Sequence, residues 1–446
     1  MQEHVYAVSK TILLMHAIVR AVRTCAHRLT QGHSALWLGN GTALALGLAQ
    51  NIVLARAAGA HEYGIYVAAA IYAGFLARMA DMGFPSAGAY FLRTTPSRAP
   101  NFLLLGIAQC IVFTPVLFGA WYLLSLVPLA TKEMGGIWNT HLLLFTALSV
   151  VMLANGLISP MLVPLGRMRA YALAICLPPF TALCMALFLA ATTRITALTL
   201  VTIVVLAQLS GVVVSAVLAA VQFRLPPVSD FFKGIGPIYG YGLQAYPGFT
   251  LKTFSQRIDR IVLINLLPPT ALAAYAIATS IRDQLSTPIT IHSLLVRNKM
   301  IDLLQTRNDP RMAKRYLRSE LRLWVSFVVP GSIVVAIIAP WLVSLLYGTS
   351  FSAAGSATSI LILSLGAIAV TTFSWCITLG SNAPGIFSVL TIASTLATVA
   401  ATAGGALLYG VTGAAVGSLV VTVLSAALWF AVAELHLRRS IAESTQ

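Results

Sequence analysis

The sequence predicts an all-α, polytopic membrane protein, and three observations support this fold class. First, 58% of the 446 residues are apolar and only 9% are charged, whereas a soluble domain carries about 25% charged residues. Second, long apolar stretches recur along the chain, and each can cross a hydrocarbon core of roughly 30 Å. Third, these stretches are continuous rather than alternating, which favours helices over the strands of a barrel.

The apolar stretches predict about twelve membrane-spanning helices separated by short polar connections. Residues 1–34 precede the first of them and contain Arg20, Arg23 and Arg28 after a short apolar run, which is the wrong flank for signal-peptide cleavage. We therefore expect a basic amphipathic segment on the cytoplasmic surface. The predicted spans are 35–56, 63–84, 102–128, 137–163, 170–191, 197–222, 237–264, 270–293, 323–346, 355–379, 384–408 and 412–434.

The distribution of basic residues predicts the orientation of the chain. Lys and Arg gather in every second connection and above all in the long hydrophilic loop 296–322. Because cytoplasmic loops are enriched in these residues, we expect a multi-pass protein with both termini in the cytoplasm. The net charge of +16 is then a feature of topology, and no nucleic-acid partner is expected.

An internal repeat predicts two lobes. When the chain is shifted by 209 positions, residues 51–70 align without a gap with residues 260–279, and Tyr66 falls on Tyr275. Both segments cross the membrane in the same sense, which is typical of a parallel repeat about an axis along the membrane normal. We expect an N-lobe over 35–226 and a C-lobe over 227–446, which are six-helix lobes related by a parallel pseudo-twofold around a central cavity.

Several motifs point to a known family. The stretch "RAAGAHEYGIYVAAAIYAGFLARMADMGFPSAGAYFL" (56–92) has an Arg-x-x-Gly-x-x-x-Tyr-Gly-x-Tyr turn followed by Asp81 and Gly83. It resembles the first two spans of polysaccharide repeat-unit flippases, a family of the multidrug/oligosaccharidyl-lipid/polysaccharide exporter superfamily. The stretches "RIDRIVLINLLPPTALAAYAIA" (257–278), "LLYGTSFSAAGSATSILILSLG" (345–366) and "YGVTGAAVGS" (409–418) resemble later parts of the same family. One departure is Leu272-Ala273-Ala274-Tyr275, where the family usually has Gly-Tyr-Tyr before Tyr-Ala.

This resemblance implies a function in surface polysaccharide biosynthesis, of O-antigen (lipopolysaccharide), capsule or exopolysaccharide. A flippase of this kind translocates lipid-linked oligosaccharide repeat units, carried on a polyprenyl pyrophosphate, by alternating access. Coupling to a proton or sodium gradient is the family's usual expectation, and no cofactor or metal is implied. The expected partners are the polyprenyl-pyrophosphate-linked glycan and membrane lipids, and a polysaccharide polymerase complex is a further candidate partner.

Ionisable residues inside the predicted spans are the candidate site. The stretch "FSQRIDRIVLIN" (254–265) holds three of them at membrane depth, where each charge costs about 3 kcal/mol unless it is paired or hydrated. Because guanidinium groups match phosphate oxygens, we expect the cations to line a wet cleft and to bind the pyrophosphate. The cations are Lys252, Arg257, Arg260, Arg282 and Arg78, and the fewer acids are Asp259, Asp283 and Asp81.

Two or more roles stay open for several of these residues. Asp259 and Asp283 would bind a coupling ion or hold an arginine in place, and Asp81 would balance charge. Arg257, Asp259 and Arg260 could instead form a self-neutralising cluster that reaches the outer interface, and Arg78 could pair with Asp81 at the inner interface. Asn40 and Asn51 would line the cavity or bridge helices, and Tyr241 and Tyr246 are candidates for contact with sugars.

Three other functions are weighed against the flippase. A cation-coupled multidrug exporter of the same superfamily should have an excess of acid in its pocket, and this sequence has an excess of base there. A membrane-embedded polysaccharide polymerase or ligase needs a large outer loop with catalytic residues, but the predicted outer loops are short and almost uncharged. A channel would show a filter-like repeat, which the sequence lacks. We expect no catalytic residues and no enzymatic activity.

Overall fold

The structure is a computed structural model, and it is helical throughout its ordered elements. It describes residues 32–94, 99–126, 132–192, 195–220, 236, 238–243, 246, 254, 257–307, 309–380 and 384–443. Almost all of the predicted amphipathic segment 1–34 and the predicted site residue Lys252 therefore lie outside the described residues. Over the described ranges the elements are helices, as the sequence predicts.

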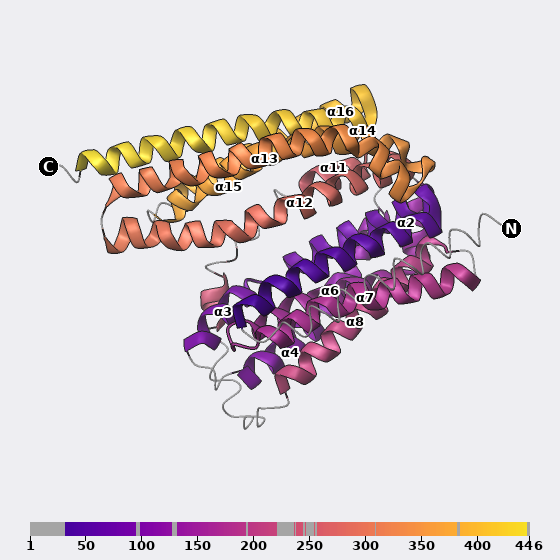
Figure 1. The fold of residues 1–446 in the computed structure, drawn as a ribbon. Helices are drawn as coiled ribbons and strands as arrows, with labels where there is room; N and C mark the ends of the chain where they lie inside the picture. The colour runs from indigo at the N-terminus through magenta and orange to yellow at the C-terminus, as the bar shows by residue number, and fades with distance from the viewer. Residues whose placement is uncertain are drawn as a thin grey trace.

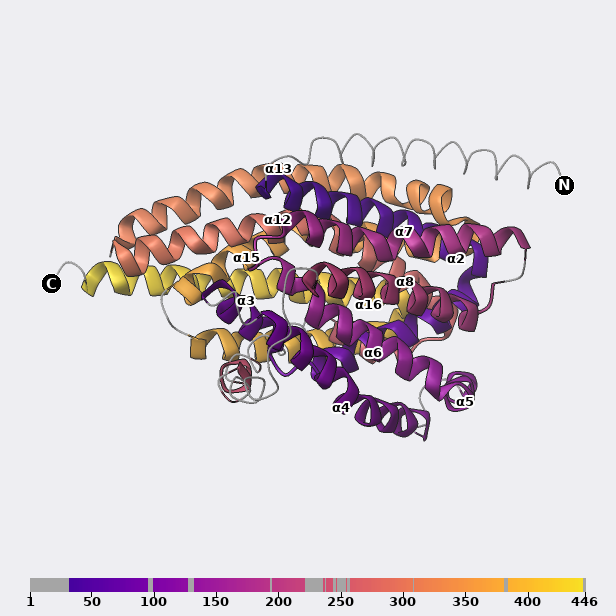
Figure 2. The same cartoon turned by 90° about the horizontal axis from the view of Figure 1, so that it is seen from below.

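The described helices form two groups in chain order, and Figures 1 and 2 show the helices of both groups running roughly along one common direction. The first group is α2 (Gly32–Met79), α3 (Phe84–Thr94), α4 (Ala99–Leu126), α5 (Lys132–Thr140), α6 (Leu142–Ile158), η2 (Ser159–Leu162), α7 (Met168–Thr192) and α8 (Ala197–Ala220). The second group is α11 (Ile258–Ile264), α12 (Pro269–Ile301), η3 (Asp302–Thr306), α13 (Pro310–Tyr347), η4 (Thr349–Phe351), α14 (Ser352–Ile362), α15 (Leu365–Gly380) and α16 (Pro384–Glu443).

Two of these helices are broken by glycines with positive φ. Gly59 in α2 has φ 77°, and Gly410 in α16 has φ 60°, a region that residues with a side chain rarely adopt. The second break reverses the chain, because a Cβ on Gly417 would lie only 2.3 Å from the carbonyl oxygen of Ala401. Two segments of α16 therefore pack against each other, and the predicted spans 384–408 and 412–434 both belong to this one element.

The protein is a multi-pass membrane protein. Within the described residues, 7 helices are long and apolar enough to cross a bilayer, or 8 if α14, preceded by η4, and α15 form one span bent by 43°. One of these is the broken helix α2, which contains the predicted span 35–56 and most of the predicted span 63–84. Many large apolar side chains on these helices are exposed, as Phe327 and Leu407 are, which is expected of a surface that faces lipid.

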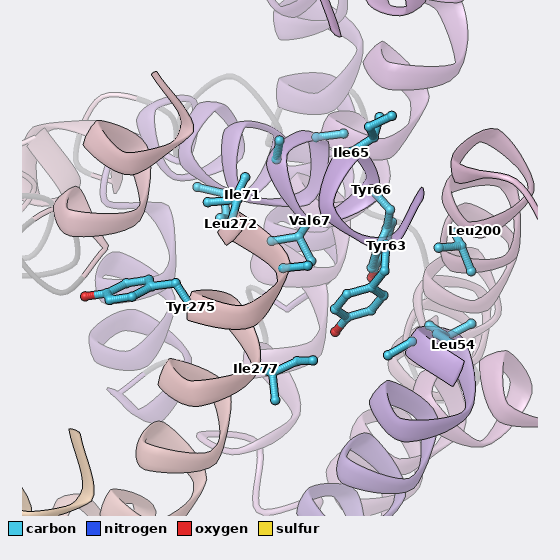
Figure 3. Close-up of a cluster of buried hydrophobic side chains, with 14 of the residues drawn as sticks. Leu54, Tyr63, Ile65, Tyr66, Val67, Ile71, Leu200, Leu272, Tyr275 and Ile277 are labelled. Carbon is cyan, nitrogen blue, oxygen red and sulfur yellow. The ribbon is translucent and has the colours of Figure 1, made fainter. Parts of the chain in front are cut away.

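One hydrophobic core joins the two groups of helices. It contains Tyr63 and Tyr66 of α2, Tyr275 of α12 and Phe351 of η4, and all of them are buried. Figure 3 shows side chains from α2, α8 and α12 in this core. These residues lie near the break in α2, near α11 and near α14, where the two groups come together in Figure 1.

The remaining large cores are built mostly within one group. A second core contains residues of the first group, such as Phe84, Phe102 and Leu157, together with Ile238, which precedes the second group in the chain. A third core contains only residues of the second group, such as Val296, Phe373 and Leu437. The two groups therefore share hydrophobic packing at one end of the molecule and pack separately toward the other end, where their ribbons diverge in Figure 1.

A glycine permits the close contact between α2 and α12. A Cβ on Gly64 would lie 1.9 Å from the carbonyl oxygen of Pro269, so any side chain there forces the two helices apart. We expect Gly64→Ala to destabilise the protein by about 1–3 kcal/mol, as overpacking does, and to lower the melting temperature in detergent. Gly47→Ala on the same helix is the matched control, since nothing lies within 4 Å of the added carbon. Equal melting temperatures for both variants would contradict this reading of the contact.

Candidate functional site

Two arginines and one aspartate form an ion-paired cluster between α11 and α12. Arg260 donates from Nη2 to Oδ2 of Asp283, and Arg282 donates to Oδ1 of the same carboxylate from Nη2 at 2.9 Å and from Nε at 3.1 Å. The side chains of Arg260 and Arg282 are 12% and 11% exposed, while that of Asp283 is 47% exposed. Asp283 thus acts as the shared counter-ion of two buried guanidinium groups.

A second carboxylate completes the charge balance of this cluster. Asp259 is buried and accepts hydrogen bonds from the Tyr275 hydroxyl at 2.8 Å and from the Arg260 backbone N–H at 2.8 Å. Two guanidinium groups therefore lie among two carboxylates, and the cluster carries no surplus charge. In this structure Asp283 pairs with both arginines at once.

Arg257 has a different environment, although it lies only three residues before Arg260. It is exposed to a pocket of about 350 Å³ on the first group of helices, which α2, α6, η2, α7 and α8 line. The guanidinium lies over Gly74, where an added Cβ would be 3.3 Å from Nη1. Within the part of the chain that the structure describes, the Arg257 side chain makes no ion pair and no hydrogen bond. An arginine without a partner in a membrane protein is costly unless water or an anion solvates it.

The same pocket contains the second predicted pair, Arg78 and Asp81. Their closest contact, from Nη1 to Oδ2, is 3.5 Å, and the Arg78 side chain is 53% exposed. Asp81 also accepts a hydrogen bond from the backbone N–H of Gly83 at 2.9 Å, which fixes its carboxylate at the end of α2. The pocket therefore holds two guanidinium groups and one carboxylate, and Arg78 is free to make further contacts through its exposed face.

Uncharged polar side chains that the sequence analysis did not select complete this pocket. Asn155 donates to Oε1 of Gln208 at 2.6 Å and accepts from the Ser159 hydroxyl at 2.5 Å. The amide NH₂ of Gln208 makes no hydrogen bond to another described residue and lies in the pocket wall. Asn155 and Gln208 stand in otherwise apolar spans, so their polarity in that setting was the signal that could have identified them.

The other predicted residues lie apart from this pocket. Asn51 of α2 donates to the Ser280 hydroxyl of α12 at 3.3 Å, so it bridges two helices. Asn40 is half-buried on α2. Tyr241 stacks on Tyr90 with ring centroids 4.9 Å apart, and the Tyr246 hydroxyl donates to the Met79 carbonyl at 2.7 Å.

The fold is that of transporters of the MOP superfamily. The structure resembles the inward-facing conformation of a multidrug resistance MATE family transporter, with a TM-score of 0.69 and 14% identity over 90% of this chain and 96% of that one. It resembles the lipid II flippase MurJ in an inward closed conformation, with a TM-score of 0.68 and 12% identity over 89% and 86% of the two chains. An outward-facing MATE family transporter matches with a TM-score of 0.62 and 15% identity over 93% and 98%.

The sequence places the chain more narrowly within that fold. Residues 53–356, more than half of the chain, match the family described as polysaccharide biosynthesis protein. The chain therefore belongs to this family, and the predicted relationship to flippases of the MOP superfamily is confirmed. No curated protein sequence matches the chain. The chain thus combines membership of this family with a fold that known membrane transporters and a flippase share.

Because Arg260 and Arg282 share the counter-ion Asp283 and Arg257 does not, we expect substitutions at the two places to affect the stability of the protein differently. We expect Asp283→Asn to lower the unfolding free energy by about 3 kcal/mol, because it leaves the buried charges of Arg260 and Arg282 without their shared counter-ion. Arg257→Gln is the control, because Arg257 has no ion-pair partner among the residues that the structure describes, and its removal should leave the melting temperature unchanged. Thermal unfolding in detergent measures both, and an equal loss in the two variants would refute the assignment of these environments.

Proposed function

We propose that this protein is a flippase that moves polyprenyl-pyrophosphate-linked oligosaccharide repeat units across the bacterial inner membrane for surface polysaccharide biosynthesis. The observation that supports this most strongly is Arg257, whose guanidinium group lies in a polar pocket at membrane depth and makes no ion pair or hydrogen bond to any described residue. Membership of the polysaccharide biosynthesis protein family also supports a role in polysaccharide biosynthesis.

The chemistry of the pocket suits a pyrophosphate. Arg257 and Arg78 offer planar sets of N–H donors that match phosphate oxygens in pairs. The Gln208 amide adds neutral donors in the same pocket. One carboxylate, Asp81, stands against the two guanidinium groups, and the surplus positive charge attracts an anionic headgroup and repels a cationic drug. Lys252 is the other cation that we assign to the headgroup, on the basis of its sequence position.

This assignment divides the predicted cations into two sets. Arg257 and Arg78 contact the substrate, whereas Arg260 and Arg282 contribute through the paired cluster with Asp283 and Asp259. Asp81 is the carboxylate that the pocket offers to a proton or a sodium ion. Sugar contacts by Tyr241, Tyr246 and Asn40 belong to the same proposal, and Asn51 is assigned to helix bridging.

We further propose twelve spans in two six-helix lobes, an N-lobe over 35–226 and a C-lobe over 227–446. The breaks at Gly59 and Gly410 let α2 and α16 each supply two spans, since an unbroken helix of 42 residues would extend about 63 Å, twice the hydrocarbon core. α11 then belongs to the seventh span. Both termini are cytoplasmic in this arrangement, as the basic connections predict.

The shared core indicates which side of the transporter is closed. Tyr63 and Tyr275 lie near the predicted outer ends of their spans, and they pack there in one core with Phe351 of the predicted outer connection 347–354. Toward the predicted cytoplasmic ends, the core around Phe84 includes Ile238 from the start of the seventh span, and the helices α12, α13, α15 and α16 have a core of their own. Release of the substrate outside then requires this core to separate.

The proposal predicts the effect of removing the unpaired guanidinium. Loss of charge-assisted hydrogen bonds, at about 1.5–3 kcal/mol each, should reduce the affinity for a polyprenyl pyrophosphate by about 10–100-fold in Arg257→Gln. Arg257→Lys should lose less, because it keeps the charge but not the fork of donors. The measurements are surface polysaccharide on cells and lipid-linked oligosaccharide retained on the cytoplasmic leaflet, with membrane protein level determined in parallel.

Arg315→Gln is the matched control for this experiment. Arg315 is an exposed arginine of α13, outside the pocket, and its replacement should leave polysaccharide export normal. Normal surface polysaccharide in Arg257→Gln cells, at a normal protein level, would refute the proposed role of the pocket.

A further inference from the structure

A second polar pocket, of about 250 Å³, lies in the other group of helices, among α12, α15 and α16. None of the described residues that line it is charged. Its wall is formed by hydroxyl side chains and two tryptophans, Trp375 of α15 and Trp429 of α16. Side chains at membrane depth are usually apolar, so a cluster of hydroxyl groups there is unusual.

The hydroxyl groups follow the helical repeat of α16. Thr391, Ser394, Thr395 and Thr398 are spaced by three and four residues, so they share one face of the first segment of this element. The second segment adds Thr422 and Ser425 to the same pocket. The two segments of α16 therefore present hydroxyl groups toward a common space.

These hydroxyl groups act mainly as acceptors in the pocket. Thr395 donates its proton to the Thr391 carbonyl at 2.6 Å, Thr398 to the Ser394 carbonyl at 2.8 Å and Thr422 to the Ser418 carbonyl at 2.7 Å. A hydroxyl has one donor and two lone pairs, so each lone pair that remains can accept a bond from a ligand. The buried Thr371 hydroxyl, also in the wall, has no hydrogen-bond partner in the described part of the chain.

A neutral ligand with many O–H donors and an apolar face satisfies these features. Such a ligand is a sugar ring, because its hydroxyl groups donate to the threonine oxygens and its C–H face packs on an indole. An anion would meet acceptor oxygens without a counter-charge, and a cation would find no carboxylate in the wall. A lipid tail would leave the acceptors unsatisfied, which is unfavourable away from water.

The two pockets occupy corresponding places in the two halves of the chain. By the predicted span numbering, the cationic pocket is lined by spans two, four, five and six together with Arg257 of span seven, and the hydroxyl pocket by spans eight, ten, eleven and twelve. A shift of six spans converts the first four spans of the cationic pocket into the four spans of the hydroxyl pocket. The two pockets thus have corresponding walls, but the cationic pocket also receives Arg257 from the second half of the chain.

We propose that the hydroxyl pocket of α12, α15 and α16 is a binding site for neutral sugar residues of the transported glycan. This inference rests on the proposed function, since it divides one lipid-linked substrate between two chemically different pockets. The cationic pocket takes the pyrophosphate, and the hydroxyl pocket takes sugar.

The test compares two probes on the purified full-length protein in detergent. The probes are a polyprenyl pyrophosphate and the same lipid bearing a short neutral oligosaccharide, and the measured quantity is the ratio of their dissociation constants. In the wild type we expect the glycan to strengthen binding by about 10-fold, as a few hydrogen bonds would. In the double variant Thr395→Val and Thr398→Val, which keeps the side-chain shape and removes two hydroxyl groups, the ratio should fall to about one.

Thr402→Val is the matched control, and it should keep the wild-type ratio. Thr402 stands four residues after Thr398 on the same helix and donates in the same way to the carbonyl of residue 398, but it does not line the pocket. Ser425→Ala on the second segment provides an independent variant, with an expected fall of about 3-fold in the ratio, if the double variant does not fold.

The outcomes separate the two proposals. A ratio of one in the wild type, or a wild-type ratio in folded hydroxyl variants, would overturn the sugar site while leaving pyrophosphate binding intact. If neither probe binds to the wild type, the proposed function itself fails. A fall of the ratio in the pocket variants but not in Thr402→Val would support the sugar site.

Discussion

The structure depends on one constraint, which is that a charged side chain among apolar helices must meet a counter-charge or water. Arg260 and Arg282 meet it through Asp283, and Asp259 completes the balance with the help of the Tyr275 hydroxyl. Arg257 does not meet it through any described residue and instead faces a pocket. The same short segment thus contains one arginine that fixes α11 to α12 and one that is available to a ligand.

The packing between the two groups of helices suits a transporter that changes shape. In a bilayer, helices associate through close packing rather than through the hydrophobic effect, because lipid tails are as apolar as leucine. The contact between α2 and α12 depends on Gly64, which brings two backbones together, and on the aromatic core around Tyr63. Such a contact can separate without exposing apolar surface to water across its whole area. The separate cores toward the other end let each group move as a unit.

Much of the fold could be predicted from the sequence, since continuous apolar stretches fix helices and glycines mark their breaks, as at Gly59 and Gly410. The site was harder to predict. Sequence spacing identified charged residues at membrane depth, but it could not distinguish Arg257 from Arg260, because the partner that separates them, Asp283, comes from another helix. Gln208 went unnoticed for the opposite reason. It carries no charge, and the importance of a neutral amide depends on which side chains surround it in space.

The differentiation of the two pockets follows from the nature of an amphiphilic, lipid-linked substrate. A pyrophosphate needs fixed cations, and cations in apolar surroundings are tolerated only where a pocket hydrates them. A sugar needs many weak acceptors instead, and threonine supplies these at little cost, because its proton is already satisfied by the helix backbone, as in Thr395 and Thr398. The two pockets have corresponding walls in the duplicated halves, and the cationic one differs by the Arg257 that it receives from the second half. In the proposed function, this difference assigns the two chemically distinct parts of one molecule to two chemically distinct pockets.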